Sequence, residues 1–160
     1  MKTNWDLWVV PVEGEHKPVV FLKTEFNEEN ARFSPDGRWV AYQSDESGKY
    51  EVYVRSFPTG SGKWEVSTNG GQAPIWRRDG KELFYWTADG TVMTADVNGT
   101  GTVFSVGNVQ PLFNVPVSIG SLLTDATADG TRFLMFPVVG GQVTPPLTPV
   151  TNWDKEIGKK

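Results

Sequence analysis

The sequence predicts an all-β protein, and three observations support that fold class. Apolar and polar residues alternate with a period of two in short runs, such as residues 39–42 and 50–54, which is typical of half-buried strands. Turn residues separate these runs: at residues 34–37 a proline and an aspartate precede Gly37, which adopts positive φ without a Cβ clash. No segment shows a convincing helical period.

The composition fits one domain with an ordinary core. The chain has 160 residues, of which 21% are charged and 38% hydrophobic, a balance that argues against disorder. The net charge of −4, without a cluster of Lys or Arg, argues against nucleic acid and against a membrane surface as partners. Because there is no cysteine, disulfides and thiolate metal sites are excluded.

Sequence features also bear on localisation. No apolar run approaches the roughly 18 residues of a membrane-spanning helix. Residues 1–15 lack the basic start and the apolar stretch of a signal peptide. We therefore expect a chain that acts in the cytoplasm or that was cut from a longer protein.

The first predicted strands cover residues 4–12 and 17–22. Pro18 places the second of them at a sheet edge, because proline cannot donate to a strand ladder. A polar connection then leads into three strands within residues 31–57. A fourth strand follows at residues 63–67, so this stretch predicts a four-stranded antiparallel sheet.

The pattern then restarts twice. Residues 73–86 repeat the Asp-Gly turn, the basic residue after it and the bulky strand that ends in tyrosine, and residues 124–136 repeat the turn again. The Asp-Gly turns begin at residues 36, 79 and 129, which are 43 and 50 residues apart. A period of about 40–50 residues with four short strands is typical of a β-propeller blade.

We therefore predict one domain over residues 1–160 with about three blades of four-stranded antiparallel sheet, which is half a propeller. Its parts are a partial blade at 1–24, blades at 31–67 and 73–113, and a last partial blade at 122–153. We expect positive φ at Gly37 and Gly80, which follow aspartate in tight turns. Six aromatic side chains are expected to pack within or between blades: Trp39, Tyr42, Tyr53, Trp76, Phe84 and Tyr85.

The run from Phe33 to Tyr42, Phe-Ser-Pro-Asp-Gly-Arg-Trp-Val-Ala-Tyr, resembles the repeat of TolB-like, WD40-like bacterial β-propellers. The wider run from Trp5 to Tyr85 resembles the C-terminal half of such six-bladed propellers, which are found behind bacterial serine/threonine kinase domains. Residues 149–153 are similar to the closing strand of that family. The resemblance covers nearly the whole chain and implies a fold, a bacterial source and often a periplasmic or extracellular location. It says almost nothing about function, since its motifs are turn and strand chemistry.

Recurring aspartates raise the question of a metal site. The four aspartates at 36, 79, 89 and 129 each precede glycine in a two-strand turn. Calcium is a possible reading, but the turn itself accounts for aspartate at these positions, so we predict no metal ligand.

No catalytic residue and no cofactor is predicted. His16 is the only histidine, and the chain has no Gly-x-Ser-x-Gly elbow with which it could form a triad. Glu28 and Glu29 are adjacent on an extended segment and point apart, so they are poor partners for glycoside hydrolysis. The Gly-Gly pairs at 70 and 140 precede no helix and do not form a phosphate loop.

A candidate binding set lies around the strands that begin each blade. In a propeller these strands face the central channel, and Arg32 and Arg77 are expected at related positions on successive inner strands. The set would bind an anionic or peptide ligand at the channel mouth. The favoured alternative is that its charged members form salt bridges between blades. The candidates are Glu29, Asn30, Arg32, Gln72, Trp76 and Arg77, with Arg78 beside them.

These observations predict a non-enzymatic binding module that takes a protein or peptide partner. The alternative is a hydrolase or a peptidase-accessory domain whose site forms at the channel between chains. A relic without a present function is a third reading. Because propellers have about four to eight blades, three are too few to close a ring. We therefore expect a homodimer in which two chains close one six-bladed ring.

Overall fold

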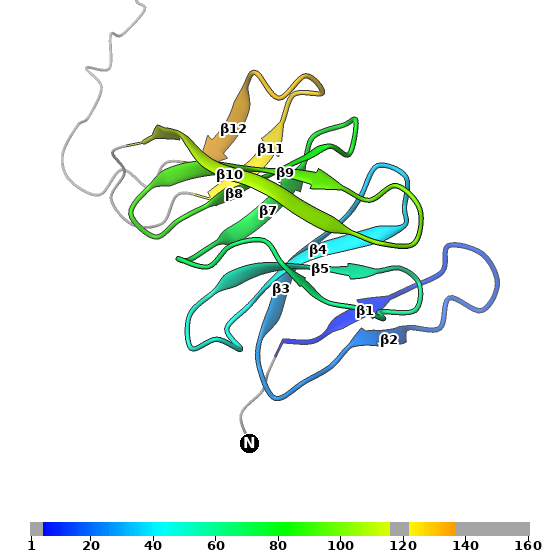
Figure 1. The fold of residues 1–160 in the computed structure, drawn as a ribbon. Helices are drawn as coiled ribbons and strands as arrows, with labels where there is room; N and C mark the ends of the chain where they lie inside the picture. The colour runs from blue at the N-terminus through cyan, green and yellow to red at the C-terminus, as the bar shows by residue number, and fades with distance from the viewer. Residues whose placement is uncertain (1–4, 116–121, 137–160) are drawn as a thin grey trace, which may run out of the picture.

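The computed structural model describes residues 5–115 and 122–136, and these residues form twelve strands and no helix. The all-β prediction is confirmed. The strands make a first hairpin, two four-stranded antiparallel sheets and a second hairpin (Figure 1). The first hairpin consists of β1 (Leu7–Val9) and β2 (Val19–Leu22). The first blade consists of β3 (Glu28–Phe33), β4 (Trp39–Ser44), β5 (Glu51–Ser56) and β6 (Trp64–Glu65), and the second blade of β7 (Gln72–Trp76), β8 (Glu82–Trp86), β9 (Thr91–Asn98) and β10 (Ser105–Asn114). The second hairpin consists of β11 (Leu122–Ala126) and β12 (Phe133–Phe136).

Within each blade the strands follow one another in space as they do in sequence. The orders are β3-β4-β5-β6 and, read from the other edge, β10-β9-β8-β7. The tight turn between the first two strands is built as the sequence predicts, with φ of +71° at both Gly37 and Gly80. Pro74 and Pro111 lie on edge strands, where the missing N–H is tolerated.

The two blades pack face to face and form the main core between them. Alternate residues of β4 and β5, such as Trp39 and Val54, meet Leu83 and Tyr85 of β8 across this interface. Phe104 lies among them, with its ring centroid 5.1 Å from that of Trp39. Of the six aromatic residues expected to pack, five are buried, whereas Trp76 is half-buried at the edge of the core.

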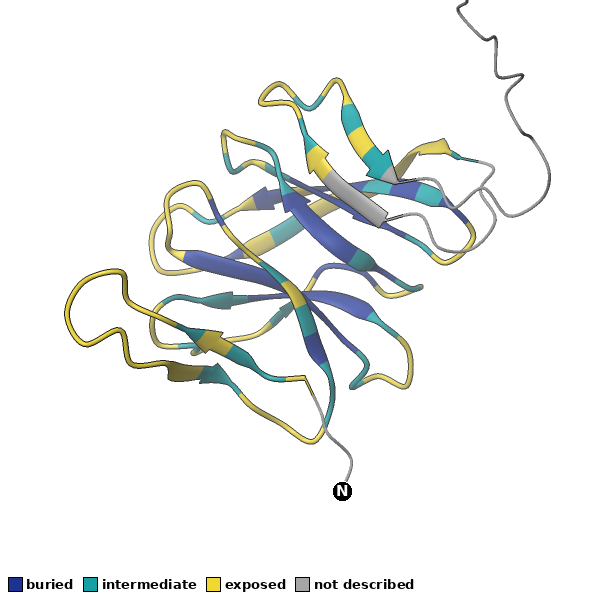
Figure 2. Cartoon of the chain, turned by 180° about the vertical axis from the view of Figure 1, so that it is seen from behind, coloured by how far each residue is buried: buried dark blue, intermediate teal, exposed yellow. Residues whose placement is uncertain are grey.

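The hairpins lie on the outer faces of the two blades. Phe21 of β2 contacts Phe57 of the first blade at 5.7 Å between ring centroids. Phe133 of β12 meets Phe84 of the second blade edge-to-face at 5.0 Å. Both blades therefore have a neighbour on each side. Among the described residues, each hairpin packs against one blade and shows a mixture of half-buried and exposed positions (Figure 2).

A bulge interrupts the first strand of each blade. Asn30 and Ala73 have φ of +51° and +48°, and the register with the second strand shifts at both places. The bulge at Ala73 turns its N–H toward the first blade, where it donates to Oε1 of the buried Gln43 at 2.9 Å. A side chain of one blade thus binds the backbone of the next.

Some predictions fall outside the described residues. These are the closing strand at 149–153 and the Gly-Gly pair at 140. Among residues 5–115 and 122–136 there is no helix long and apolar enough to cross a membrane.

Candidate functional site

The inner strands of successive repeats lie next to one another, with β7 between β3 and β11 (Figure 1). At the end of these strands is a pocket of about 640 Å³, which we call the inner pocket. Its lining residues occupy three positions of the repeat, at four, three and one residues before the aspartate of the Asp-Gly turn. They are Arg32, Ile75 and Asp125; Phe33, Trp76 and Ala126; and Pro35, Arg78 and Ala128.

Two cationic side chains of the inner pocket have no anionic partner within residues 5–115 and 122–136. Arg32 and Arg78 are both exposed, and neither side chain forms an ion pair or a hydrogen bond with the described residues. Asp125, the one acidic residue of the pocket, accepts a hydrogen bond from the N–H of Ala126 at 2.8 Å. An unpaired guanidinium offers a planar fork of N–H donors that suits a carboxylate or a phosphate.

Aromatic side chains lie beside these arginines. Phe33 leaves 52% of its surface exposed, although it ends a strand of the first blade. Trp76, its equivalent in the second blade, donates from Nε1 to the carbonyl oxygen of Arg32 at 3.1 Å, which fixes the indole between the two inner strands. The inner pocket therefore combines unpaired positive charge with apolar surface.

Arg77 does not occupy the position that the sequence suggested. The sheet register pairs Arg32 with Ala41 and Ile75 with Phe84, so Ile75, rather than Arg77, is the equivalent of Arg32. Arg77 lies one residue beyond β7, in the turn. The expectation that Arg32 and Arg77 occupy related positions was therefore wrong. Arg77 lies two residues before the aspartate of its Asp-Gly turn, and the equivalent residue of the first blade is Ser34.

Arg77 is held by carboxylates of its own blade. Its Nη2 lies 2.5 Å from Oδ2 of Asp79, and its Nη1 pairs with Glu82. Hydrogen bonds from Arg77 are the main cause that lowers the pKa of Asp79 to about 2. The salt bridges expected between blades are thus found within one blade for this residue.

The remaining predicted residues lie at the opposite end of the inner strands. Glu29 accepts hydrogen bonds from Tyr50 at 3.0 Å and from Gln43 at 3.2 Å. Asn30 donates to Gln43 at 2.9 Å. Gln72 begins β7 and lies seven residues before the aspartate of its Asp-Gly turn, as does Glu29, the second residue of β3. The structure therefore divides the predicted set: Arg32 and Trp76 line the inner pocket, whereas Glu29, Asn30 and Gln72 do not.

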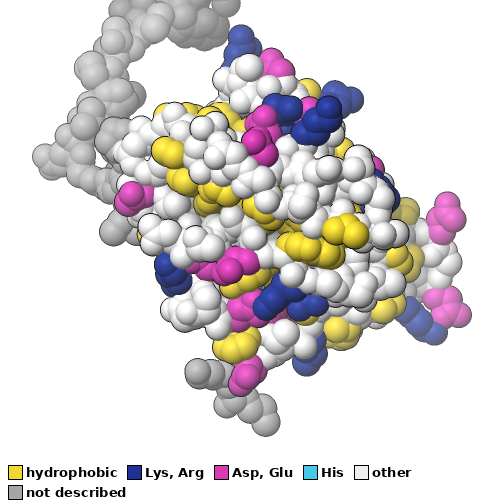
Figure 3. Space-filling view, viewed as in Figure 1, with side chains coloured by type: hydrophobic (Ala, Val, Ile, Leu, Met, Phe, Trp, Pro, Cys, Tyr) yellow, Lys and Arg dark blue, Asp and Glu magenta, His cyan; other side chains and the backbone are white. Residues whose placement is uncertain are grey.

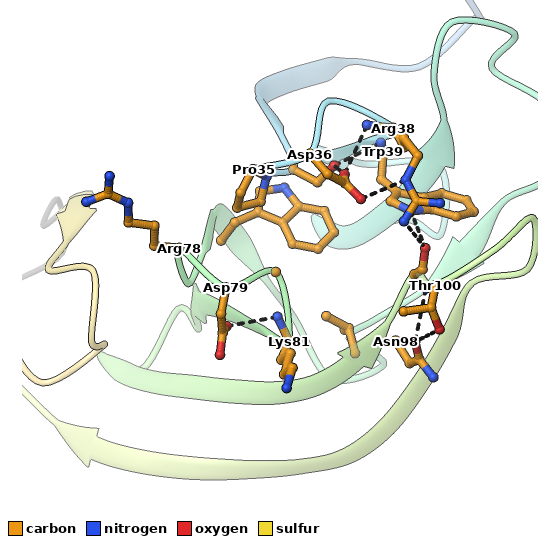
Figure 4. Close-up of a pocket in the computed structure, with 14 residues that line it drawn as sticks. Pro35, Asp36, Arg38, Trp39, Arg78, Asp79, Lys81, Asn98 and Thr100 are labelled. Atoms are coloured by element: carbon orange, nitrogen blue, oxygen red, sulfur yellow. Dashed lines mark hydrogen bonds and ion pairs between the residues drawn. The ribbon is translucent and has the colours of Figure 1, made fainter.

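A second pocket of about 620 Å³ lies between the turns of the two blades (Figure 4). Here Arg38 pairs with Asp36 at 2.7 Å and donates to the carbonyl oxygens of Gly99 and Gly101 at 2.8 and 2.9 Å. Its cation is therefore already used to join the blades. In Figure 4 the side chain of Arg78 extends away from Asp36 and Arg38, on the other side of the turn.

The aspartates of the repeated turns have the structural role that the sequence favoured. Each accepts a hydrogen bond from the backbone N–H two residues later, at 3.0 to 3.2 Å. His16 lies in the hairpin turn between β1 and β2, where its Nδ1 is 3.1 Å from the carbonyl oxygen of Pro11. Among the described residues, no group of three or more His, Asp or Glu could hold a metal ion.

Sequence reasoning missed Phe33 and Asp125 as pocket residues. The signal was present in the repeat: counted back from the Asp-Gly turns, Phe33 falls on Trp76 and Asp125 falls on Arg32. An alignment that started from the turns would have brought these positions together.

Comparison with known proteins supports the fold. No protein-family model and no curated protein matches the chain. A solved structure of TolB from Acinetobacter baumannii matches with a TM-score of 0.63 and 21% identity, over 86% of this chain and 33% of that one. A structure assigned as TolB from Agrobacterium tumefaciens matches with a TM-score of 0.56 and 19% identity, over 69% of this chain and 41% of that one. The chain spans less than half of the length of either structure. It has a TolB-like β-propeller fold, and this partial coverage fits one half of a propeller.

Proposed function

We propose that this chain is a non-catalytic binding module of propeller type, which holds an acidic and partly apolar segment of a protein partner in the inner pocket. The observation that carries the proposal is the pair of exposed arginines, Arg32 and Arg78, which have no partner in the described part of the chain and lie beside Phe33 and Trp76. A carboxylate side chain would bind the arginines, and an apolar neighbour in the same segment would cover the aromatic rings.

The charge of the chain favours a peptide over a nucleic acid. The net charge is −4, and the inner pocket itself contains Asp125, so its positive charge is local. Nucleic acid would need a wider basic surface. A volume of about 640 Å³ has room for a few side chains, which suits a short segment of a protein.

The test is a binding titration with a fluorescein-labelled peptide of alternating glutamate and leucine. We expect saturable binding that weakens with salt, and a loss of about tenfold or more in affinity for Arg32→Gln/Arg78→Gln, because two charge-assisted hydrogen-bond sites are removed. Lys81→Gln is the matched control: it removes an exposed cation that lines the second pocket and not the inner one. Unchanged binding by the double variant, or equal binding of a lysine-leucine peptide, would refute the proposal.

The homodimeric six-bladed ring belongs to the same proposal, since a closed ring would surround the inner pocket with three further repeats. A hydrolytic site between chains is the alternative that the sequence left open. A screen of ester and peptide substrates tests it: turnover that Arg77→Ala abolishes would replace the binding module by an enzyme.

A further inference from the structure

The two hairpins correspond to different halves of one blade. β1 and β2 occupy the places of β5 and β6: the N–H of Glu28 donates to Trp5 O at 2.7 Å, as the N–H of Gly71 donates to Tyr50 O at 2.9 Å. These bonds join the start of an inner strand to the residues before the third strand of the preceding blade. The first hairpin is therefore a third and a fourth strand.

The second hairpin is a first and a second strand. The N–H of Thr127 donates to the carbonyl of Arg132 at 2.9 Å, as the N–H of Arg77 does to that of Glu82 at the same distance. In both complete blades the second strand pairs with the third, as β4 with β5 and β8 with β9. Among the described strands β12 has no third-strand neighbour and β1 has no second-strand neighbour, so each hairpin lacks what the other has.

Both hairpins carry apolar side chains that are exposed at positions buried in the complete blades. Leu134 of β12 is 62% exposed, whereas its equivalent in the second blade, Phe84, is 1% exposed. Trp8 of β1 is 52% exposed, whereas its equivalent Tyr53 is 3% exposed. Hydrophobic side chains reach the surface around the first hairpin in the space-filling view (Figure 3). Large exposed apolar residues on strands that form the edge of the described sheets are the features of an interaction surface.

We propose that β12 of one copy pairs with β1 of a second copy, in the register of the complete blades. This inference deepens the ring proposed above and assigns its seam. In the first blade Ala41 pairs with Val54 and Tyr42 with Tyr53. By equivalence Leu134 lies opposite Val9 of the second copy, and Met135 lies opposite Trp8. Two such seams complete two composite blades and leave no open edge at β1 or β12.

A second copy is the occupant because strand number and side-chain character both match. The described strands amount to three blades of four, and two copies give six, which lies within the range that closes. A shift of one residue would turn every side chain to the opposite face of the composite blade, so the register is specified. The same shift provides the control for the experiment.

The experiment uses the absence of cysteine from the chain. Two single variants, Val9→Cys and Leu134→Cys, are mixed and oxidised, and the products are separated on a non-reducing gel. We expect a covalent heterodimer whose linked peptides join positions 9 and 134. The pair Val10→Cys and Leu134→Cys, which places the thiols on opposite faces, is expected to link at least about tenfold less. The double variant Val9→Cys/Leu134→Cys reports whether any link forms within one chain.

A second variant keeps the proposal falsifiable if the thiols are poorly oriented. Leu134→Asp changes an exposed side chain, so a single copy should remain folded while the mass in solution falls from dimer to monomer. A wild-type chain that is monomeric at micromolar concentration, a link only within one chain, or equal linking by the control pair overturns the proposal. None of these results depends on the peptide titration, which tests Arg32 and Arg78. Failure of the seam and failure of the binding site are therefore distinguishable.

Discussion

The first blade and the first hairpin contain the same repeat, but their surroundings differ. In β5 every residue of Glu51–Val54 is buried between two layers. In β1 the pattern alternates, with Leu7 and Val9 half-buried and Trp8 exposed, because only one face contacts another described element. The residue types are similar, so burial here is decided by the next layer and not by the strand itself. Four predictions test or refine this comparison, in order of decreasing effect.

Removal of an aromatic ring between two complete blades has the largest expected effect. Trp39 is 3% exposed, packs on Trp64 and Phe104, and donates to Gly99 O at 3.1 Å. Trp39→Ala should lower the free energy of unfolding by about 3–5 kcal/mol, measured by urea denaturation. Trp5→Ala, at a residue 68% exposed beside the first hairpin, should cost less than about 1 kcal/mol. Similar losses for both would mean that the hairpin is buried as fully as the blade.

Loss of the bond between the blades has the next largest effect. Gln43→Ala removes the acceptor of the Ala73 N–H and leaves that buried donor unsatisfied. We expect a loss of about 1–3 kcal/mol in the same assay. The exposed Gln110 of β10 provides the control, and its change to alanine should stay within about 0.5 kcal/mol.

Strain in the repeated turn is expected to cost less. Gly37 has φ of +71°, and a Cβ there would meet nothing within 4 Å, so Gly37→Val tests backbone strain alone. The expected loss is about 1–2 kcal/mol. Gly37→Asn should lose less, since asparagine tolerates this region better. Equal unfolding free energies for glycine and valine would contradict the assigned turn.

The smallest effect concerns two buried glutamates and depends on pH. Desolvation by burial is the main cause that raises the pKa of Glu28, and its Oε2 has no hydrogen-bond partner. Glu51 is equally buried but accepts from Ser67 and from the N–H of Gly70. A raised pKa means that the folded state binds the proton more tightly, so ionised Glu28 destabilises the fold above its folded pKa.

Glu28→Gln should therefore be more stable than the wild type at pH 7, and this advantage should shrink as the pH falls through the folded pKa toward 4.5. Glu51→Gln should be less stable at pH 7, because charge-assisted hydrogen bonds are lost. Thermal unfolding of both variants across this pH range measures the difference. If Glu28→Gln instead destabilises the protein at pH 7, the negative charge of Glu28 is compensated by its surroundings in the folded state.

The repeat was readable from the sequence because turns have strict requirements. Aspartate followed by glycine at 36, 79 and 129 gave the blades, and alternation gave the strands. The bulges were not readable: Ala73 adopts a left-handed φ that alanine does not favour, and its N–H binds Gln43, a contact with the other blade that no local pattern indicates.

Two of the predicted site residues lie together in the structure. Arg32 and Trp76 lie in the inner pocket as a strand-based argument suggests. Arg77 was expected beside them, but its ion pairs with Asp79 and Glu82 depend on side-chain directions in a turn, which alternation of apolar residues does not determine. Phe33 was not among the predicted site residues, and its exposure depends on how far the neighbouring layer extends.

The contacts at the two ends of β4 have a geometric consequence. Gln43, near the end of the strand, binds the N–H of Ala73, and Arg38, just before its start, binds the carbonyls of Gly99 and Gly101. Two separated points of attachment restrict the rotation of one blade on the other more than a single point would, and the apolar core between the blades restricts it further. In any circular array the angles between neighbours must add up to one full turn, so a small error at each joint prevents the last unit from meeting the first. The double attachment of β4 constrains that angle through contacts within the chain itself.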